Sequence, residues 1–393
     1  MILCYLAYGG SPHTQKWVKY FADKGHEIHL ISHSRLDSGD LPNIKVHGVK
    51  ELQNIHAANR LKAVIQFAEK IRFHRMGTIV QGFRELFTAL KILRIICRVK
   101  PDVLHAHFVT TWGFWGALCG FHPYVLTAWG SDILRRPKES KLLRWRANFA
   151  LTRADQITCD AEHMVENLVE LGAVRAKVRL INFGVDIQQF HPDQRDEKFR
   201  EKLGIEPDAP IIISLRSLYP HYDVESLVNA VPRVLRNTPN AKFIIAGNGE
   251  QRSALQELAS SLGVYESIKF PGWIPNHELP RYLASADIYV STSLTDGGIA
   301  ASTAEAMACE LPVVITDFGD NQKWVKDGEG GFIVPLKNPD ALADRMVYLL
   351  KHENVRKRFG KINRKTIEER NNLQAEMEKM ERIYEELKLK PRS

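Results

Sequence analysis

The residues best suited to chemistry lie where predicted strands end and helices begin. The apolar run IIISLR ends at Arg216, and a later strand leads into a helix through the run Asp296-Gly297-Gly298-Ile299-Ala300-Ala301-Ser302. A guanidinium stays charged and can bind phosphate through two nitrogens. The N–H groups of a helix's first turn have no partner inside the helix and attract anions. The sequence therefore predicts that the start of the helix near Ser302 can hold a diphosphate.

Two glycine-rich turns follow other predicted strands. Gly247-Asn248-Gly249 ends the strand AKFIIAG, and Gly9-Gly10 ends the first strand of the chain. Without a side chain, each turn would let a ligand approach the backbone closely. Turn geometry alone is the alternative explanation of both.

His105 and His107 alternate along the strand DVLHAHF, so both side chains face the same side of it. Two histidines at this spacing could bind a metal, but no third ligand lies nearby in the sequence, and we expect no metal. His107 is nearer the strand end and is the better candidate for contacting a substrate or its phosphate.

Short apolar strands alternate with longer helical stretches along the chain and position these residues. Each half of the chain contains one such series. Such an alternation predicts parallel βαβ units, and 393 residues are too many for one ordinary core. We predict two doubly wound α/β domains, at residues 1–190 and 191–370, and a terminal helix at residues 371–393.

Composition narrows the class of protein and its compartment. The chain is 44% hydrophobic and 25% charged, which is typical of globular proteins. The five cysteines have no paired spacing, as expected of reduced thiols, and the opening MILCYLAYGG fits a buried strand better than a signal peptide. We therefore expect a cytoplasmic protein.

Charge is unevenly distributed along the chain. The net charge is +8, and between Arg60 and Lys100 ten basic residues stand against two acidic ones. This segment indicates an anionic partner, which could be a membrane surface, a lipid phosphate or a nucleic acid. A solvated helix face is the alternative.

The order of motifs along the chain resembles retaining glycosyltransferases of family 4. The resemblance rests on HEIHLIS, DVLHAHF, GVDIQQFHP, FIIAGNGEQRSALQELASSLGV, IKFPGWIPNHELPRYLASADIYVSTS and AEAMACELPVVITD, and it covers nearly the whole chain. It implies the GT-B fold, with two Rossmann-like domains facing a central cleft. The first domain would face the acceptor, the second would hold the donor, and the final helix would cross back to the first domain.

The resemblance also implies an activity. The enzyme would transfer a sugar from a nucleoside-diphosphate sugar with retention and without a required cofactor or metal. The acceptor would be a glycan or a lipid-linked cell-envelope precursor, with the basic segment on the inner face of an anionic membrane and no nucleic-acid partner.

Matching the family's motifs assigns roles in the second domain. Arg216 matches the arginine that contacts the donor diphosphate, and His221 stands where the family has a lysine. Glu305 matches the glutamate that binds the donor ribose, while Trp273 and Ile274 would contact the base.

Two positions depart from the family's pattern. The family's first glutamate stands eight residues before the second, where this chain has Gly297. Either Asp296 serves instead, or the sugar is bound by backbone N–H groups of residues 298–300. In the first domain, Trp129 replaces a frequent histidine in the run TAWGSD, which predicts an aromatic platform on the acceptor side together with His107 and Asp132.

Three other interpretations remain open at this point. Ser302 and Glu305 have the spacing of a helix capping box, which explains both without a ligand. A nucleotide-sugar epimerase or hydrolase of the same fold would bind the same donor, and a catalytically degenerate binding protein would bind it without turnover. A dinucleotide-dependent oxidoreductase is disfavoured because no G-x-G-x-x-G follows the first strand.

Overall fold

The computed structural model describes residues 1–33, 43–49 and 74–389, with the side chains of residues 74–84 and 197 outside the description. The chain forms two compact units. Unit 1 consists of Met1–Asp160, Met164–Ile181 and Met377–Ser393, and unit 2 consists of Ala161–His163 and Asn182–Glu376.

Unit 1 contains a parallel seven-stranded sheet in the order β3-β2-β1-β4-β5-β6-β7. The strands are β1 (Ile2–Leu6), β2 (Glu27–Ser32), β3 (Ile44–Gly48), β4 (Val103–His107), β5 (Tyr124–Thr127), β6 (Gln156–Cys159) and β7 (Val178–Leu180). Strands β4, β5 and β6 are buried along their whole length, and β1 is buried except at Ile2, as expected when helices cover both faces of a parallel sheet.

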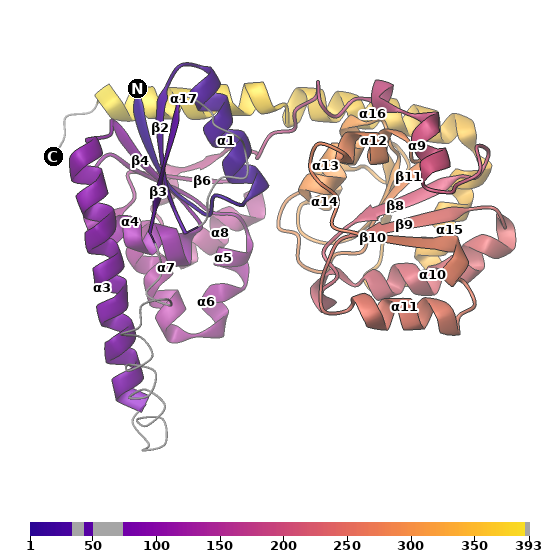
Figure 1. The fold of residues 1–393 in the computed structure, drawn as a ribbon, viewed down its shortest axis with the longest axis horizontal. Coiled ribbons are helices and arrows are strands. Elements are labelled where there is room, and N and C mark those ends of the chain that lie inside the picture. Colours follow the sequence, from indigo (N-terminus) through magenta and orange to yellow (C-terminus); the bar gives the residue numbers. More distant parts are fainter. Residues whose placement is uncertain (34–42, 50–73, 390–393) are drawn as a thin grey trace. The chain divides into compact units, whose positions relative to one another are not determined.

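The helices of unit 1 connect these strands. They are α1 (Pro12–Asp23), α3 (His74–Val99), the π-helical turn η2 (Val109–Gly113), α4 (Phe114–Cys119), α5 (Ser131–Leu134), α6 (Arg136–Glu139), α7 (Lys141–Arg153), α8 (Glu162–Glu170) and η3 (Arg175–Lys177). In Figure 1, α3 extends well past the edge of the sheet.

The terminal helix α17 (Leu373–Leu389) packs on the sheet of unit 1. Its Tyr384 is fully buried, with its hydroxyl 2.8 Å from that of Tyr5 and 2.5 Å from Nδ1 of His105. Nε2 of His105 lies 2.6 Å from the Thr127 hydroxyl. Nδ1 of His105 thus joins the sheet to α17, and Nε2 joins β4 to β5.

Unit 2 contains a parallel six-stranded sheet in the order β10-β9-β8-β11-β12-β13. The strands are β8 (Ile211–Leu215), β9 (Lys242–Ala246), β10 (Ile268–Gly272), β11 (Ile288–Ser291), β12 (Val313–Thr316) and β13 (Gly331–Val334). In both units the strand order reverses around the first strand, which confirms the prediction of two doubly wound α/β domains.

The helices of unit 2 complete its layers. They are η4 (Pro192–Gln194), α9 (Glu197–Lys202), η5 (Pro220–Tyr222), α10 (Val224–Asn237), α11 (Arg252–Ser261), η6 (Tyr265–Ser267), α12 (Leu279–Ala284), α13 (Ala301–Ala308), α14 (Asn321–Trp324), α15 (Pro339–Lys351) and α16 (Glu353–Arg370).

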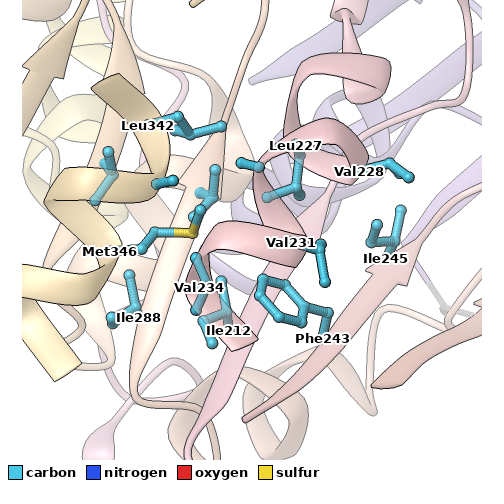
Figure 2. Close-up of a cluster of buried hydrophobic side chains, with 14 of the residues drawn as sticks. Ile212, Leu227, Val228, Val231, Val234, Phe243, Ile245, Ile288, Leu342 and Met346 are labelled. Carbon is cyan, nitrogen blue, oxygen red and sulfur yellow. The ribbon is translucent and has the colours of Figure 1, made fainter. Parts of the chain in front are cut away.

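One hydrophobic core lies between the unit 2 sheet and helices α10 and α15 (Figure 2). The apolar residues of α10 recur at helical spacing, so one face of the helix is buried against β8 and β9. Its buried side chains include Leu227, Val228, Val231 and Val234. This packing fixes the strands whose carboxyl ends carry Arg216 and the Gly247 turn.

Candidate functional site

The predicted donor residues of unit 2 gather at one edge of its sheet. Arg216 directly follows β8, and Gly247 directly follows β9. Trp273 follows β10, and Asp296 lies in the connection between β11 and α13. The carboxyl ends of parallel strands share one edge, which is where open α/β sheets bind ligands.

Arg216 is held by side chains from the connection after β11. Its Nη2 donates to Oδ1 of Asp296 at 2.6 Å, and its Nη1 lies 3.4 Å from the Ser302 hydroxyl. Only 9% of the Arg216 side chain and 15% of the Asp296 side chain are exposed. This nearly buried ion pair is the main charged feature of the edge.

Aromatic groups surround the guanidinium of Arg216. Its central carbon lies 4.4 Å from the ring centroid of Tyr222, and the Tyr289 hydroxyl lies 2.7 Å from that of Ser302. Burial works against the charged guanidinium, but Asp296 and the two tyrosines outweigh it and raise the pKa of Arg216. Arg216 is therefore a permanent cation.

The Gly247-Asn248-Gly249 turn positions Arg216. A Cβ on Gly247 would lie 2.2 Å from the carbonyl oxygen of Arg216, and one on Gly249 would lie 2.1 Å from that of Leu218. Gly247 also has a φ of +138°, a backbone conformation that residues with a side chain rarely adopt. Both glycines are thus required for close packing of the two strand ends, as the turn-geometry explanation proposed.

Helix α13 begins two residues earlier than the capping box requires. Its N-cap is Ala300, and no side chain caps it. Ser302 therefore lies inside the first turn, and its hydroxyl contacts Tyr289 and Arg216 instead of an amide of the helix. The capping-box interpretation of Ser302 and Glu305 is wrong. Glu305 is buried on the same helix, with 7% of its surface exposed.

His221 and Trp273 lie at the same sheet edge. His221 is half-buried, with its ring stacked on that of Tyr219 at 5.9 Å between centroids. Its backbone oxygen accepts from the N–H of Leu294, which ties the β11 connection to η5. Trp273 is 64% exposed, whereas the adjacent Ile274 is buried.

The predicted acceptor residues of unit 1 also cluster at the carboxyl ends of strands. His107 ends β4 and is 2% exposed, with its Nδ1 3.3 Å from the Thr14 hydroxyl. Its Nε2 has no hydrogen-bond partner among the described residues. Burial and the nearby ring of His13 lower the pKa of His107 to about 3, so the imidazole is neutral at physiological pH.

Trp129 lies beside His107 at this edge of unit 1. The two rings meet edge to face at 5.4 Å, and the indole stacks on His13 at 4.8 Å. The pKa of His13 is lowered to about 4 by burial and by Lys16, so His13 is neutral as well. The cluster is therefore aromatic and uncharged.

Asp132 is fully buried and binds backbone atoms. Its carboxylate accepts from the N–H groups of Val109 at 2.8 Å and of Trp129 at 3.0 Å. Burial raises the pKa of Asp132 to about 6, despite these hydrogen bonds. Asp132 thus holds the Trp129 turn against η2.

Gly9 and Gly10 follow β1 at the same edge. The N–H of Gly9 donates to the Ser32 hydroxyl at 2.8 Å, and its carbonyl accepts from the Gln15 side chain at 3.0 Å. A Cβ on Gly10 would lie 2.9 Å from the ring of Tyr8. The turn is therefore packed against its own neighbours.

The aromatic partners of the site were not predicted from the sequence. Tyr222 and Tyr289 surround Arg216, and His13 stacks on Trp129. Tyr222 could have been found from its position next to His221. The contacts of Tyr289 and His13 join segments far apart in the chain, so the sequence gives no signal for them. In the described part of the chain, no group of three His, Cys, Asp or Glu side chains could hold a metal ion.

The fold class follows from solved structures. HepE of Anabaena in complex with UDP aligns with a TM-score of 0.77, covering 98% of this chain and 100% of that chain at 17% identity. This likeness establishes the GT-B fold.

The family follows from the sequence. The family Glycosyl transferases group 1 matches residues 195–366, and Glycosyl transferase 4-like matches residues 3–66 and 54–161. An uncharacterized glycosyltransferase of Methanocaldococcus jannaschii is 30% identical over 64% of this chain and 67% of its own length. The chain belongs to the group 1 glycosyltransferases, which confirms the resemblance.

A further relative carries a more specific description. The GDP-mannose-dependent alpha-(1-6)-phosphatidylinositol monomannoside mannosyltransferase of Mycolicibacterium smegmatis is 34% identical over 42% of this chain. The match spans 45% of that relative's length. Together the relatives favour a transferase over an epimerase, a hydrolase or a degenerate binding protein.

Proposed function

We propose that the chain transfers a sugar, with retention, from a nucleoside-diphosphate sugar bound at the edge of unit 2 to an acceptor bound at the edge of unit 1. The observation that carries this proposal is Arg216, a nearly buried cation at a strand end beside the uncapped start of α13. A buried arginine next to free backbone N–H groups suits a diphosphate.

The proposed roles in unit 2 follow from the charge that develops during transfer. Departure of a nucleoside diphosphate needs stabilisation of negative charge more than proton transfer. Arg216 and the N–H groups at residues 300–302 would supply it, with His221 at the periphery. Glu305 would bind the ribose and Trp273 with Ile274 the base. Because Arg216 supplies a fixed positive charge, we propose that transfer requires no metal or other cofactor.

The edge of unit 1 supports binding of an uncharged, hydroxyl-bearing group. The half-buried Trp129 would supply an aromatic contact of the kind on which sugar rings pack. The Nε2 of His107, which has no partner among the described residues, would exchange a hydrogen bond with a hydroxyl. A neutral imidazole is suited to orienting a hydroxyl rather than to donating a proton. Gly9 and Gly10 lie at the end of β1, at the same edge of the unit 1 sheet as Trp129 and His107.

A lipid-linked acceptor and an anionic membrane surface are proposed as partners. The mycobacterial relative is described as acting on phosphatidylinositol monomannoside. On α3 the side chains of Leu86, Phe87 and Leu90 are exposed, and on α7 those of Leu142 and Trp145. Exposed apolar and aromatic side chains with basic neighbours suit a membrane interface.

Basic residues flank these apolar side chains. They include Lys91, Arg94 and Arg98 on α3, Lys138 on α6, and Lys141 and Arg144 on α7. Glu85 of α3 pairs with Arg146 of α7 at 2.9 Å, which joins the two helices. Of the basic segment predicted from the sequence, residues 60–73 lie outside the described residues. No helix within the described ranges has both the length and the apolar character needed to cross a bilayer.

Donor binding is the first test of the proposal. A thermal-shift screen would compare UDP, GDP, ADP and their sugars, because a ligand at a hundred times its dissociation constant stabilises a protein by about 2.7 kcal/mol. Turnover with the best donor, with and without EDTA, should then depend on an added acceptor. Release of free sugar at the same rate without acceptor would support a hydrolase, and binding without any turnover would support a degenerate binding protein.

Vesicle cosedimentation tests the membrane partner. Binding to anionic vesicles should exceed binding to neutral ones and weaken with salt, since each surface Lys or Arg contributes about 1 kcal/mol near anionic lipid. The double variant Lys141→Glu/Arg144→Glu should lose most of this binding. The matched control Lys357→Glu/Lys361→Glu makes the same charge change on α16 of unit 2 and should retain it. Equal binding to both vesicle types would contradict the proposal.

A further inference from the structure

We propose that Asp296 is an internal counterion of Arg216, which the diphosphate of the ligand displaces, and that this exchange limits how tightly the nucleoside-diphosphate product is held. The inference rests on the proposed donor site. It assigns Asp296 a role in setting affinity for the diphosphate, separate from any contact with the transferred sugar.

The ion pair occupies one side of the guanidinium and leaves another unused. Nη2 of Arg216 donates to Asp296 at 2.6 Å, and Nη1 lies 3.4 Å from the Ser302 hydroxyl. The Nε of Arg216 is buried and has no hydrogen-bond partner among the described residues. A buried donor without an acceptor is costly, so Arg216 retains capacity for a further oxyanion.

Asp296 and a diphosphate would compete for Arg216. The aspartate oxygen already accepts from Nη2 of Arg216. A phosphate oxygen brought to the same nitrogens would lie beside the carboxylate, and two like charges at such a distance repel strongly when water is excluded. Exchange of one anion for the other avoids this repulsion and keeps Arg216 neutralised in both states.

The backbone around Asp296 is fixed, so the exchange requires only rotation of its side chain. Leu294 donates its N–H to the carbonyl of His221, and Asp320 donates its N–H to the carbonyl of Gly297. A Cβ on Gly319 would lie 2.3 Å from the carbonyl oxygen of Asp296, so the two turns are in close contact. The carboxylate itself is held by Arg216 alone in the contacts recorded for the described residues.

Replacement of Asp296 by asparagine tests the counterion role. The variant leaves Arg216 without a charged partner, so the affinity for UDP or GDP, whichever the wild type prefers, should rise about tenfold, equivalent to about 1.4 kcal/mol. Inhibition by that product should strengthen in parallel. Asp344→Asn is the matched control, because it removes one exposed carboxylate of the same unit, paired with Arg233, and should leave the affinity unchanged.

Calorimetry with the nucleoside diphosphate and with inorganic pyrophosphate separates the outcomes. Unchanged or weaker binding of both ligands by Asp296→Asn would overturn the counterion role. If wild type binds neither UDP, GDP nor ADP, the proposed function fails, while stronger pyrophosphate binding by the variant would still support the exchange. Absence of pyrophosphate binding in every variant would overturn it. If Asp296→Asn does not fold, Asp296→Ser provides the same loss of charge with a smaller polar group.

Discussion

The two units have sheets that reverse their order around the first strand, yet the carboxyl edges of these sheets differ in charge. In unit 1 the edge is lined by the neutral imidazoles of His13 and His107 and by the indole of Trp129. In unit 2 it contains the ion pair of Arg216 and Asp296. The shared topology supplies the location of a site, and the side chains decide which ligand can bind there.

Two carboxylates with different partners make the contrast sharper. Asp132 of unit 1 is held by backbone N–H groups, and its pKa is raised to about 6. Asp296 of unit 2 has an arginine as its partner. A carboxylate that binds the backbone fixes a turn, whereas one that pairs with a cationic side chain can be exchanged for another anion. We therefore expect Asp132 to govern stability and the residues around Arg216 to govern affinity.

The largest expected effect is on stability in unit 1. Because the pKa of Asp132 is raised in the folded protein, its protonated form favours folding, and this contribution is present below pH 4 and lost as the pH rises through about 6. The shift from an ordinary value near 3.9 corresponds to about 3 kcal/mol. Asp132→Asn cannot ionise, so its free energy of unfolding relative to wild type should increase between pH 4 and 7.

Urea denaturation at pH 4, 5, 6 and 7 measures this difference. Asparagine also loses one acceptor for the N–H groups of Val109 and Trp129, which adds a cost that does not depend on pH. Only the pH-dependent part reports ionisation. Parallel curves for the two proteins would show that Asp132 does not titrate in this range.

The second effect concerns the affinity of unit 2 for the diphosphate. Arg216→Lys keeps the charge but loses the planar fork, so one charge-assisted hydrogen bond should be lost and the affinity for the preferred nucleoside diphosphate should fall about thirtyfold, or about 2 kcal/mol. Calorimetry measures this loss of affinity. The same variant should not alter the KM for the acceptor. If the KM for the acceptor changed as much as the affinity for the nucleoside diphosphate, the two units would not have separate binding roles.

Much of the fold was predictable because its signals are local. Alternating strands and helices define βαβ units, and Arg216 was correctly placed at a strand end by the apolar run before it. The pairing of Arg216 with Asp296 joins positions 80 residues apart and depends on how the β11 connection packs on Gly319. No spacing rule encodes such a contact.

At the start of α13, by contrast, a local sequence pattern predicted a structure that does not form. Ser302 and Glu305 have the spacing of a capping box, but the helix begins at Ala301. The Ser302 hydroxyl is engaged by Tyr289, a residue of the neighbouring strand. A tertiary hydrogen bond therefore overrides the local preference, and only the folded arrangement of β11 and α13 reveals it.

The third effect is smaller and concerns Glu305. Glutamine is nearly isosteric with glutamate, so Glu305→Gln should leave the melting temperature near that of wild type. If the carboxylate accepts from the donor ribose, the variant should bind the nucleotide about fivefold more weakly, or about 1 kcal/mol. A donor analogue without ribose hydroxyls should bind both proteins equally. Equal binding of the complete donor would remove Glu305 from the site.

The smallest expected effect concerns His221, which lies at the periphery of the cationic edge. Its ring stacks on Tyr219 and lies 4.3 Å from that of Tyr222, whose other neighbour is the Arg216 guanidinium. An imidazole loses its charge near physiological pH, whereas a lysine keeps its own. If His221 assists as a cation, affinity for the diphosphate should weaken from pH 6 to pH 8 in the wild type, and His221→Lys should reduce this dependence.

The size of this last effect follows from the exposure of the site. His221 is only half-buried, so water screens its attraction for phosphate, and we expect about a threefold change in affinity, or about 0.6 kcal/mol. Phosphate ionisation also changes over this range, which makes His221→Gln the necessary control because it carries no charge at either pH. If wild type, lysine and glutamine variants share one pH profile, His221 does not contribute through charge. The charge of the unit 2 edge would then reside in Arg216.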